Sequence, residues 1–179
     1  MADEISLKSV LADLEKASGA DRGLDAAVAI AVGYIKEYAE RNGEHGHIRG
    51  YDGPSGRVPY SAPWWPGRNP WPPVGLNDVA IRNEVPEWTA SLDATIALVE
   101  RVLPGWWWIA GLCGLTGRAS IGPDYNGPHR ERLLREFPIE KFDAGFDVDL
   151  APGDGIHRAC YALLTAMFRA LVAKMEGVE

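Results

Sequence analysis

Proline is concentrated in one internal stretch of the chain, and this stretch limits the fold more than any other feature. Eight of the thirteen prolines lie between Pro54 and Pro86, and four of the seven tryptophans lie in or next to the same stretch. Proline fixes φ and removes a backbone donor, so neither a long helix nor a central strand can run through residues 59–73. The sequence therefore predicts a long connection over residues 43–88, with a short strand near residues 47–51.

Three segments around this connection have the apolar period of amphipathic helices. Apolar side chains recur at helical spacing over residues 7–14, 24–38 and 92–103. Opposite charges four residues apart between residues 36 and 41 predict that the second helix continues to Asn42. The third helix begins near Ser91 and ends before the Pro-Gly pair at residues 104–105.

The second half of the chain alternates between strand and helix signals. Residues 106–109 form an apolar run that is typical of a strand covered on both sides. A turn before residues 118–121 and the alternation of apolar and acidic side chains over residues 146–150 predict two more strands, and a short helix is expected at residues 130–136. The last helix has an apolar stripe that we expect to be buried, comprising Ile156, Cys160, Leu163, Leu164, Met167 and Leu171, whereas Arg158, Thr165, Arg169 and Glu176 are expected to face water.

The order of these elements predicts an α+β fold. We expect an antiparallel sheet of about three to four strands layered with about four helices, similar to an α/β/α sandwich. A chain of 179 residues is long enough to bury a core without disulfides or metal. We therefore expect a single domain over residues 1–179, with the long connection at residues 43–88 and a polar insertion at residues 123–141.

The charge of the chain argues against several classes of partner. Lys and Arg number 18 against 25 Asp and Glu, a net charge of −7, which disfavours non-specific binding to nucleic acids and anionic membranes. No apolar run reaches the roughly 18 residues that span a bilayer, and the N-terminus lacks a basic-then-apolar signal pattern. The sequence therefore predicts a cytoplasmic protein with no membrane partner.

Two blocks of the sequence resemble a known family. Residues 19–29 (GADRGLDAAVA) and residues 85–94 (VPEWTASLDA) are similar to the first and second blocks of the phage ABA sandwich domain, a family of small phage and prophage proteins. The alanine-rich last helix with Cys160 resembles the third block. The resemblance implies helix layers around a sheet in a phage or prophage gene product, and it brings no activity and no catalytic residues.

The sequence departs from the family pattern at three places. The family usually ends its second helix at the glycine equivalent to Gly33 and then starts a strand, where the charges of this chain indicate more helix. Residues 59–73 are unusually rich in proline and tryptophan, and the insertion at residues 123–141 is long. The last two departures are places where a particular partner would be recognised.

The strongest candidate site is the tryptophan-rich part of the long connection. Aromatic rings beside a guanidinium can stack on a base or sugar, or serve as anchors in a protein interface. The alternative is that the rings cover the protein's own core, since tryptophan is highly buried on average. The candidate binding set comprises Arg57, Tyr60, Trp64, Trp65, Arg68 and Trp71.

Metal and catalytic patterns are weak. His45-x-His47 and Asp147-x-Asp149 have spacings that some metal sites use. Solvated loop histidines and the wet face of an edge strand explain the same residues without a metal. The basic residues at 129–135 are explained by a solvated helix face, although a phosphate or an acidic partner would also fit them. The sequence thus predicts no metal, no cofactor and no catalytic residue.

The leading functional hypothesis is a non-enzymatic phage or prophage accessory protein that acts by binding in the cytoplasm of a bacterial host. Its partner would be a host protein or a small nucleotide-like ligand, and the phage context suggests inhibition of a host defence pathway. Two alternatives stay open. One is a metal-dependent hydrolase that uses Asp147, Asp149 and His47, and the other is a virion or assembly component that forms a homo-oligomer through an apolar patch.

Overall fold

A computed structural model of the chain describes residues 6–41, 47–54, 56–59, 85–113, 116–150 and 155–177. Within these ranges the chain forms six helices and two antiparallel sheets of three strands each, so the predicted α+β class is confirmed. The chain divides into two compact units, a larger one of residues 1–21 and 87–179 and a smaller one of residues 22–86. The single domain over residues 1–179 stays a prediction.

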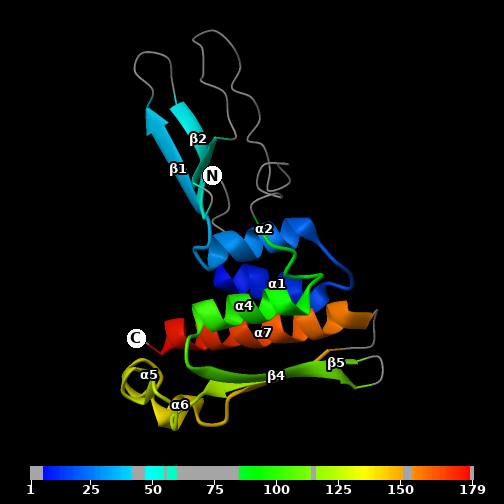
Figure 1. The fold of residues 1–179 in the computed structure, drawn as a ribbon, viewed down its shortest axis with the longest axis vertical. Coiled ribbons are helices and arrows are strands. Elements are labelled where there is room, and N and C mark those ends of the chain that lie inside the picture. Colours follow the sequence, from blue (N-terminus) through cyan, green and yellow to red (C-terminus); the bar gives the residue numbers. More distant parts are fainter. Residues whose placement is uncertain are drawn as a thin grey trace. The chain divides into compact units, whose positions relative to one another are not determined.

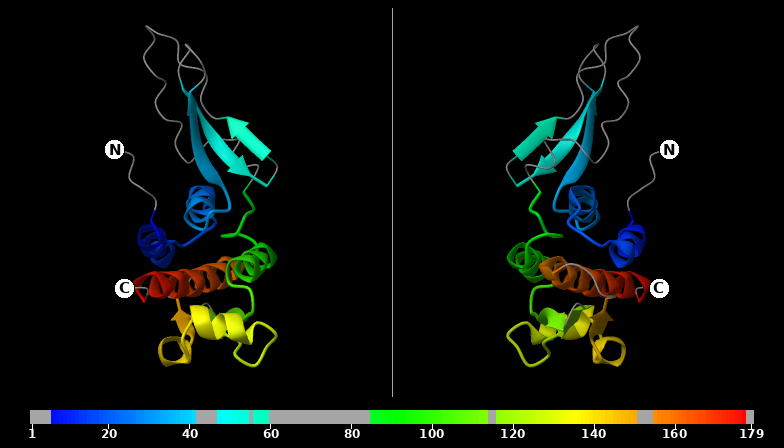
Figure 2. Two further views of the ribbon diagram at one scale, coloured as in Figure 1. Left: turned by 90° about the vertical axis from the view of Figure 1, so that its left-hand side faces the viewer. Right: turned by 90° about the vertical axis from the view of Figure 1, so that its right-hand side faces the viewer.

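The larger unit is built around helix α7 (Gly155–Glu176) (Figure 1). Strands β4 (Trp106–Cys113), β5 (Thr116–Pro123) and β6 (Phe146–Asp149) form an antiparallel sheet in the order β4-β5-β6. Helix α7 packs on one face of this sheet, and helices α1 (Leu7–Lys16) and α4 (Leu92–Val102) pack against α7 (Figures 1 and 2). The expected helices at residues 7–14 and 92–103, the strands and the last helix are thereby confirmed.

Helix α7 is buried on nearly all sides over its first half. Every side chain from Arg158 to Phe168 is buried, because the sheet covers one side of the helix and α1 and α4 cover others. The expectation that Arg158 and Thr165 face water is therefore wrong, and so is the expected burial of Ile156, which is exposed. By length and composition α7 would suffice to cross a membrane, but 67% of its apolar window is buried inside the protein, as in the core helix of a globular fold.

Two short helices enclose an aromatic cluster at the start of β4. Helix α5 (Arg130–Glu136), which the sequence predicts, and helix α6 (Ile139–Phe142), which it does not, follow strand β5. The ring centroid of Trp106 lies 4.9 Å from that of Phe137 and 6.4 Å from that of Phe142, in edge-to-face contacts. Such pairs add stability beyond the area that they bury.

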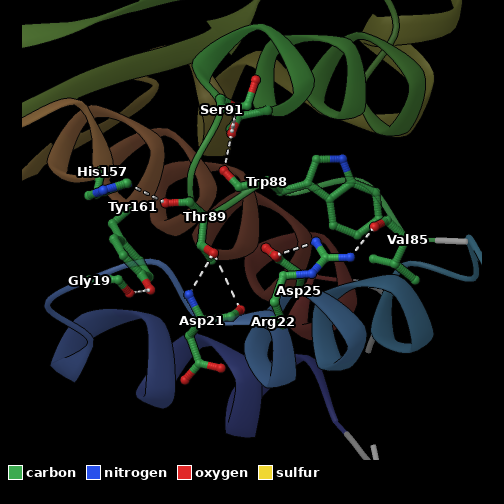
Figure 3. A network of polar contacts seen from close by, with 11 residues as sticks. Gly19, Asp21, Arg22, Asp25, Val85, Trp88, Thr89, Ser91, His157 and Tyr161 are labelled. Carbon is green, nitrogen blue, oxygen red and sulfur yellow. Dashed lines mark hydrogen bonds and ion pairs between the residues drawn. The ribbon is translucent and has the colours of Figure 1, made fainter. Parts of the chain in front are cut away.

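The smaller unit is a helix followed by a three-stranded meander. Helix α2 (Arg22–Ala31) leads into strands β1 (Lys36–Arg41), β2 (His47–Gly53) and β3 (Gly56–Pro59), paired in that order. The strand expected near residues 47–51 is confirmed, whereas β1 and β3 are not predicted. At the start of α2, Arg22 forms an ion pair of 2.9 Å with the buried Asp25 and donates to the carbonyl of Val85 (Figure 3).

Helix α2 ends at Ala31, and the expectation that it continues to Asn42 is wrong. Gly33 adopts a φ of 68°, and the N–H groups of the next two residues both donate to the carbonyl of Ala29. A glycine with positive φ is the usual end of a helix, and its effect outweighs charge pairs worth a few tenths of a kcal/mol each. The chain therefore follows the pattern of the resembling family at this glycine.

A buried threonine links two loops of the larger unit (Figure 3). The Thr89 hydroxyl accepts a hydrogen bond from the Asp21 N–H at 2.9 Å and donates to the Asp21 carbonyl at 3.3 Å. The Thr89 carbonyl lies 3.2 Å from Nδ1 of His157 on α7. Ser91 then caps α4 by accepting from the Ala94 N–H. The Trp-Thr-Ala-Ser run behind the family resemblance thus has a structural role in this chain.

We expect Thr89→Val to lower the free energy of unfolding by about 0.5–1.5 kcal/mol, because the buried Thr89 hydroxyl no longer bonds to the backbone of Asp21. Thr165 is the matched control. Its side chain is equally buried, and its hydroxyl has no hydrogen-bond partner in the described part of the chain. Thr165→Val should therefore be neutral or stabilising. Urea unfolding measures both variants, and equal losses would contradict the role given to Thr89.

We expect Gly33→Ala to destabilise the protein by about 1–2 kcal/mol, because alanine is strained at positive φ. Gly19→Ala is the control. A Cβ at either glycine meets no atom within 4 Å, but only Gly33 has a positive φ. Thermal unfolding should therefore separate the two variants, and a Gly33→Ala protein as stable as Gly19→Ala would show that this turn does not terminate the helix as described.

Candidate functional site

The binding set predicted from the sequence falls outside the described residues. Tyr60, Trp64, Trp65, Arg68 and Trp71 all belong to residues 60–84, of which the structure describes none. Arg57 lies in strand β3, where its backbone pairs with Asp52 of β2, but its side chain is also outside the description. Their role in binding stays a prediction.

The sheet of the larger unit has one covered face and one face turned away from α7. A Cβ on Gly117 would lie 2.1 Å from the carbonyl oxygen of Arg158, which identifies the face that α7 covers. Side chains alternate between the two faces of a strand, so the strand register assigns each residue to a face. The face away from α7, here called the open face, carries Trp107, Ile109, Gly111, Arg118, Ser120, Gly122, Asp147 and Asp149.

Strand β4 is more exposed than its sequence predicts. The apolar run at residues 106–109 predicts a strand covered on both sides, but the exposed fraction is 39% at Trp107 and 68% at Ile109. The prediction of two-sided cover is therefore wrong. The physical reason is that α7 packs on one face only, and no element in the described part of the chain encloses Ile109 on the other.

The open face contains a shallow cavity of about 510 Å³. Ile109 and Gly111 of β4 line one side of it, and charged and polar residues of β5 and β6 line the other. A Cβ on Gly111 would meet no atom within 4 Å, so the space above this glycine is open. At the end of the face the Trp107 ring lies so close to Gly122 that a Cβ there would be 2.7 Å from Cζ2, which fixes the indole against the sheet.

The charged side of the cavity is a pair of interactions between β5 and β6. Nε of Arg118 lies 2.7 Å from Oδ1 of Asp149, and the Ser120 hydroxyl donates to Asp147. The Arg118–Asp149 pair is mostly exposed, so it contributes at most about 1 kcal/mol to stability. On this side of the cavity the guanidinium of Arg118 faces the carboxylates of Asp147 and Asp149. The open face therefore has a negative balance and suits apolar or cationic groups better than phosphate.

The two carboxylates of β6 lie where the sequence places them, on the wet face of an edge strand. Within the described ranges, no group of three or more His, Cys, Asp and Glu is arranged to hold a metal ion. His47, the third group in the hydrolase hypothesis, belongs to β2 of the smaller unit, and its side chain is not among those described. His45 lies outside the described residues.

The basic helix α5 is partly neutralised by its own neighbours. Glu136 accepts from Nζ of Lys174 on α7 at 3.1 Å and lies 3.6 Å from Nη1 of Arg132. Arg132 also donates to the carbonyl of Pro104. The hydrogen bond from Lys174 is the main cause of a lowered pKa at Glu136, and the nearby positive charges of Lys174, Arg132 and Arg135 add to it. These contacts hold α5 against α7 and the loop before β4. They favour a structural role for the basic residues at 129–135 over the binding of a phosphate or an acidic partner.

Comparisons with known protein families, with curated proteins and with solved structures give no match to this chain. The resemblance to the phage ABA sandwich domain stays a prediction. The candidate site consequently depends on the geometry of the open face alone.

The open face is absent from the residues predicted as a site, because the apolar run of β4 suggested burial. One signal did point to it. The alternation of acidic and apolar residues on β6 predicts that Asp147 and Asp149 face solvent, and residues opposite them on neighbouring strands must share that face. The pairing of β6 with β5, and of β5 with β4, could not be deduced from the sequence.

We expect Glu136→Gln to lower the free energy of unfolding at about pH 7 but hardly at about pH 3. The pKa of Glu136 is lowered from 4.5 in the folded protein, so its contribution is present above pH 4.5 and is lost as the pH falls through the lowered pKa. Urea unfolding at the two pH values tests this. Glu131→Gln, at an exposed residue of the same helix, is the control. A loss in Glu136→Gln that is equal at both pH values would contradict the ion-pair account.

Proposed function

We propose that this protein acts by binding another protein, without catalysis, and that the open face is part of its binding surface. The observation that carries the proposal is the exposure of Trp107 and Ile109 on the open face, which also carries the Arg118–Asp149 pair farther along the strands. Tryptophan and arginine are among the residues that are enriched at protein interfaces and at their hot spots. A strand residue that is 68% exposed, such as Ile109, gains little by burial in the isolated chain.

A protein partner fits the open face better than a nucleotide-like ligand. Asp147 and Asp149 repel phosphate, and the single guanidinium of Arg118 is already paired with Asp149. The cavity is shallow and one wall is apolar, which suits an inserted side chain from a partner surface. A partner with apolar groups flanked by Lys or Arg would complement both walls.

The biological setting of the proposal comes from the resemblance of residues 19–29 and 85–94 to the phage ABA sandwich domain. On this basis we propose a phage or prophage accessory protein of the bacterial cytoplasm whose partner is a host protein. Inhibition of a host defence pathway is the form of activity that this setting favours. The tryptophans of residues 60–84 stay a separate candidate binding set, predicted from the sequence alone.

We expect Ser120→Arg to abolish capture of the host partner. Ser120 lies on the central strand of the open face, so arginine there fills the cavity and adds a cation facing a basic partner. The control is Ser18→Arg, the same substitution at an exposed residue of the same unit. Proteins retained from bacterial lysate on immobilised wild type should fall at least about tenfold with Ser120→Arg and stay unchanged with Ser18→Arg.

Other results would contradict binding through the open face or would favour one of the alternative functions. Equal retention by both variants would exclude the open face as the binding surface. A thermal shift with ATP, ADP or AMP that Arg118→Ala removes would favour the small-ligand hypothesis. Heat released on titration with Mg²⁺ or Mn²⁺ that Asp147→Asn removes would favour the hydrolase hypothesis.

A further inference from the structure

Strand β4 is an unprotected edge of its sheet. In the part of the chain that the structure describes, β4 pairs with β5 on one side only. Its eight residues, WWWIAGLC, include no charged residue and no proline. The opposite edge, β6, has four residues of which two are carboxylates. Charges and short length are the usual means by which proteins prevent strand addition, so one edge of this sheet is protected and the other is not.

The exposed side chains of β4 lie on both faces of the strand. Ile109 and Leu112 are three residues apart, so they point to opposite faces, and their exposed fractions are 68% and 48%. A partner docked on the open face alone would cover Ile109 and leave Leu112 exposed. A strand added along the edge of β4 would contact both. The exposure pattern therefore favours pairing along the edge.

We propose that two copies of this chain pair through their β4 strands to form one six-stranded antiparallel sheet. A strand that pairs antiparallel with its own copy makes a self-complementary interface about a two-fold axis perpendicular to the sheet. Because β4 carries no charge, the two strands bring no like charges together, although each chain has a net charge of −7. The same axis joins the two open faces into one continuous surface.

The register with Ile109 at the axis fits the side chains best. In this register Trp107 lies opposite Gly111 of the second copy, and the space above Gly111 is open in the single chain. The indole of Trp107 lies over Gly122 of β5, away from the edge, so a glycine opposite it in the second copy brings no side chain that would clash with Trp107. The two Ile109 side chains would then contact each other and lose their exposure to water, as a favourable cross-strand pair.

The choice of a second copy over a foreign strand follows from this fit. The chain itself supplies an uncharged strand of the right length, which places Ile109 opposite Ile109 and no bulky side chain opposite Trp107. Pairing extends the surface of the proposed function but does not depend on it, because the oligomeric state is measured on the purified chain without any host protein.

The test is the mass of the full chain in solution, measured by light scattering after size-exclusion chromatography over a concentration series. The wild type should reach twice the monomer mass. Ile109→Lys and Ile109→Glu should each weaken association at least about tenfold, because like charges then meet at the axis. An equimolar mixture of the two variants should restore the dimer. Ile139→Lys, at an exposed isoleucine of α6, is the control that should remain dimeric.

A wild type that is monomeric at every concentration would overturn the proposal. The edge of β4 would then be available to a strand of another protein or to another segment of this chain. A dimer that persists in Ile109→Lys would also overturn it. A mixture of the two charged variants that stays monomeric would refute the two-fold pairing at Ile109. Circular dichroism confirms that each variant is folded, as expected from the high exposure of this side chain in the single chain.

Discussion

The burial of helix α7 is the constraint on which the rest of the larger unit depends. One side of the helix packs so closely on the sheet that only a glycine fits at Gly117, against the carbonyl of Arg158. Other side chains of α7 bond to the loop after α1, where Tyr161 donates to the carbonyl of Gly19 and Arg158 to that of Ala17. Apolar burial supplies most of the stability of such a layer, and these bonds fix its register against α1.

The same arrangement explains where the candidate site lies. With α7, α1 and α4 on one side, the opposite face of the β4-β5-β6 sheet keeps Trp107 and Ile109 at the surface. The paired charges of β5 and β6 make one half of that face polar, while β4 stays apolar up to the edge that has no neighbouring strand among the described residues. The proposed binding on the open face and the proposed pairing along the edge of β4 both depend on this one-sided packing.

Much of the fold could be predicted from the sequence, and the errors have physical causes. The apolar period locates α1 and α4 well, and Ser91 marks the start of α4, because these signals are local. The predicted continuation of α2 to Asn42 is wrong because the charge pairs that favour it are weaker than the terminating effect of Gly33, two residues after the end of the helix at Ala31. The burial of Thr165 and the exposure of Ile109 depend on which elements pack together, and no local pattern contains that information. The open face was missed for the same reason.

Hydrogen exchange in strand β4 tests the central claim most directly. The account predicts that the amides of residues 106–113 that point away from β5 exchange slowly in concentrated protein and faster on dilution. The β4 amides that bond to β5, and the amides of β5 itself, which has a neighbour on each side, stay protected at every concentration. Protection of the amides pointing away from β5 that is equally strong in the most dilute sample would contradict the account, because it would mean that the edge is already covered within a single chain.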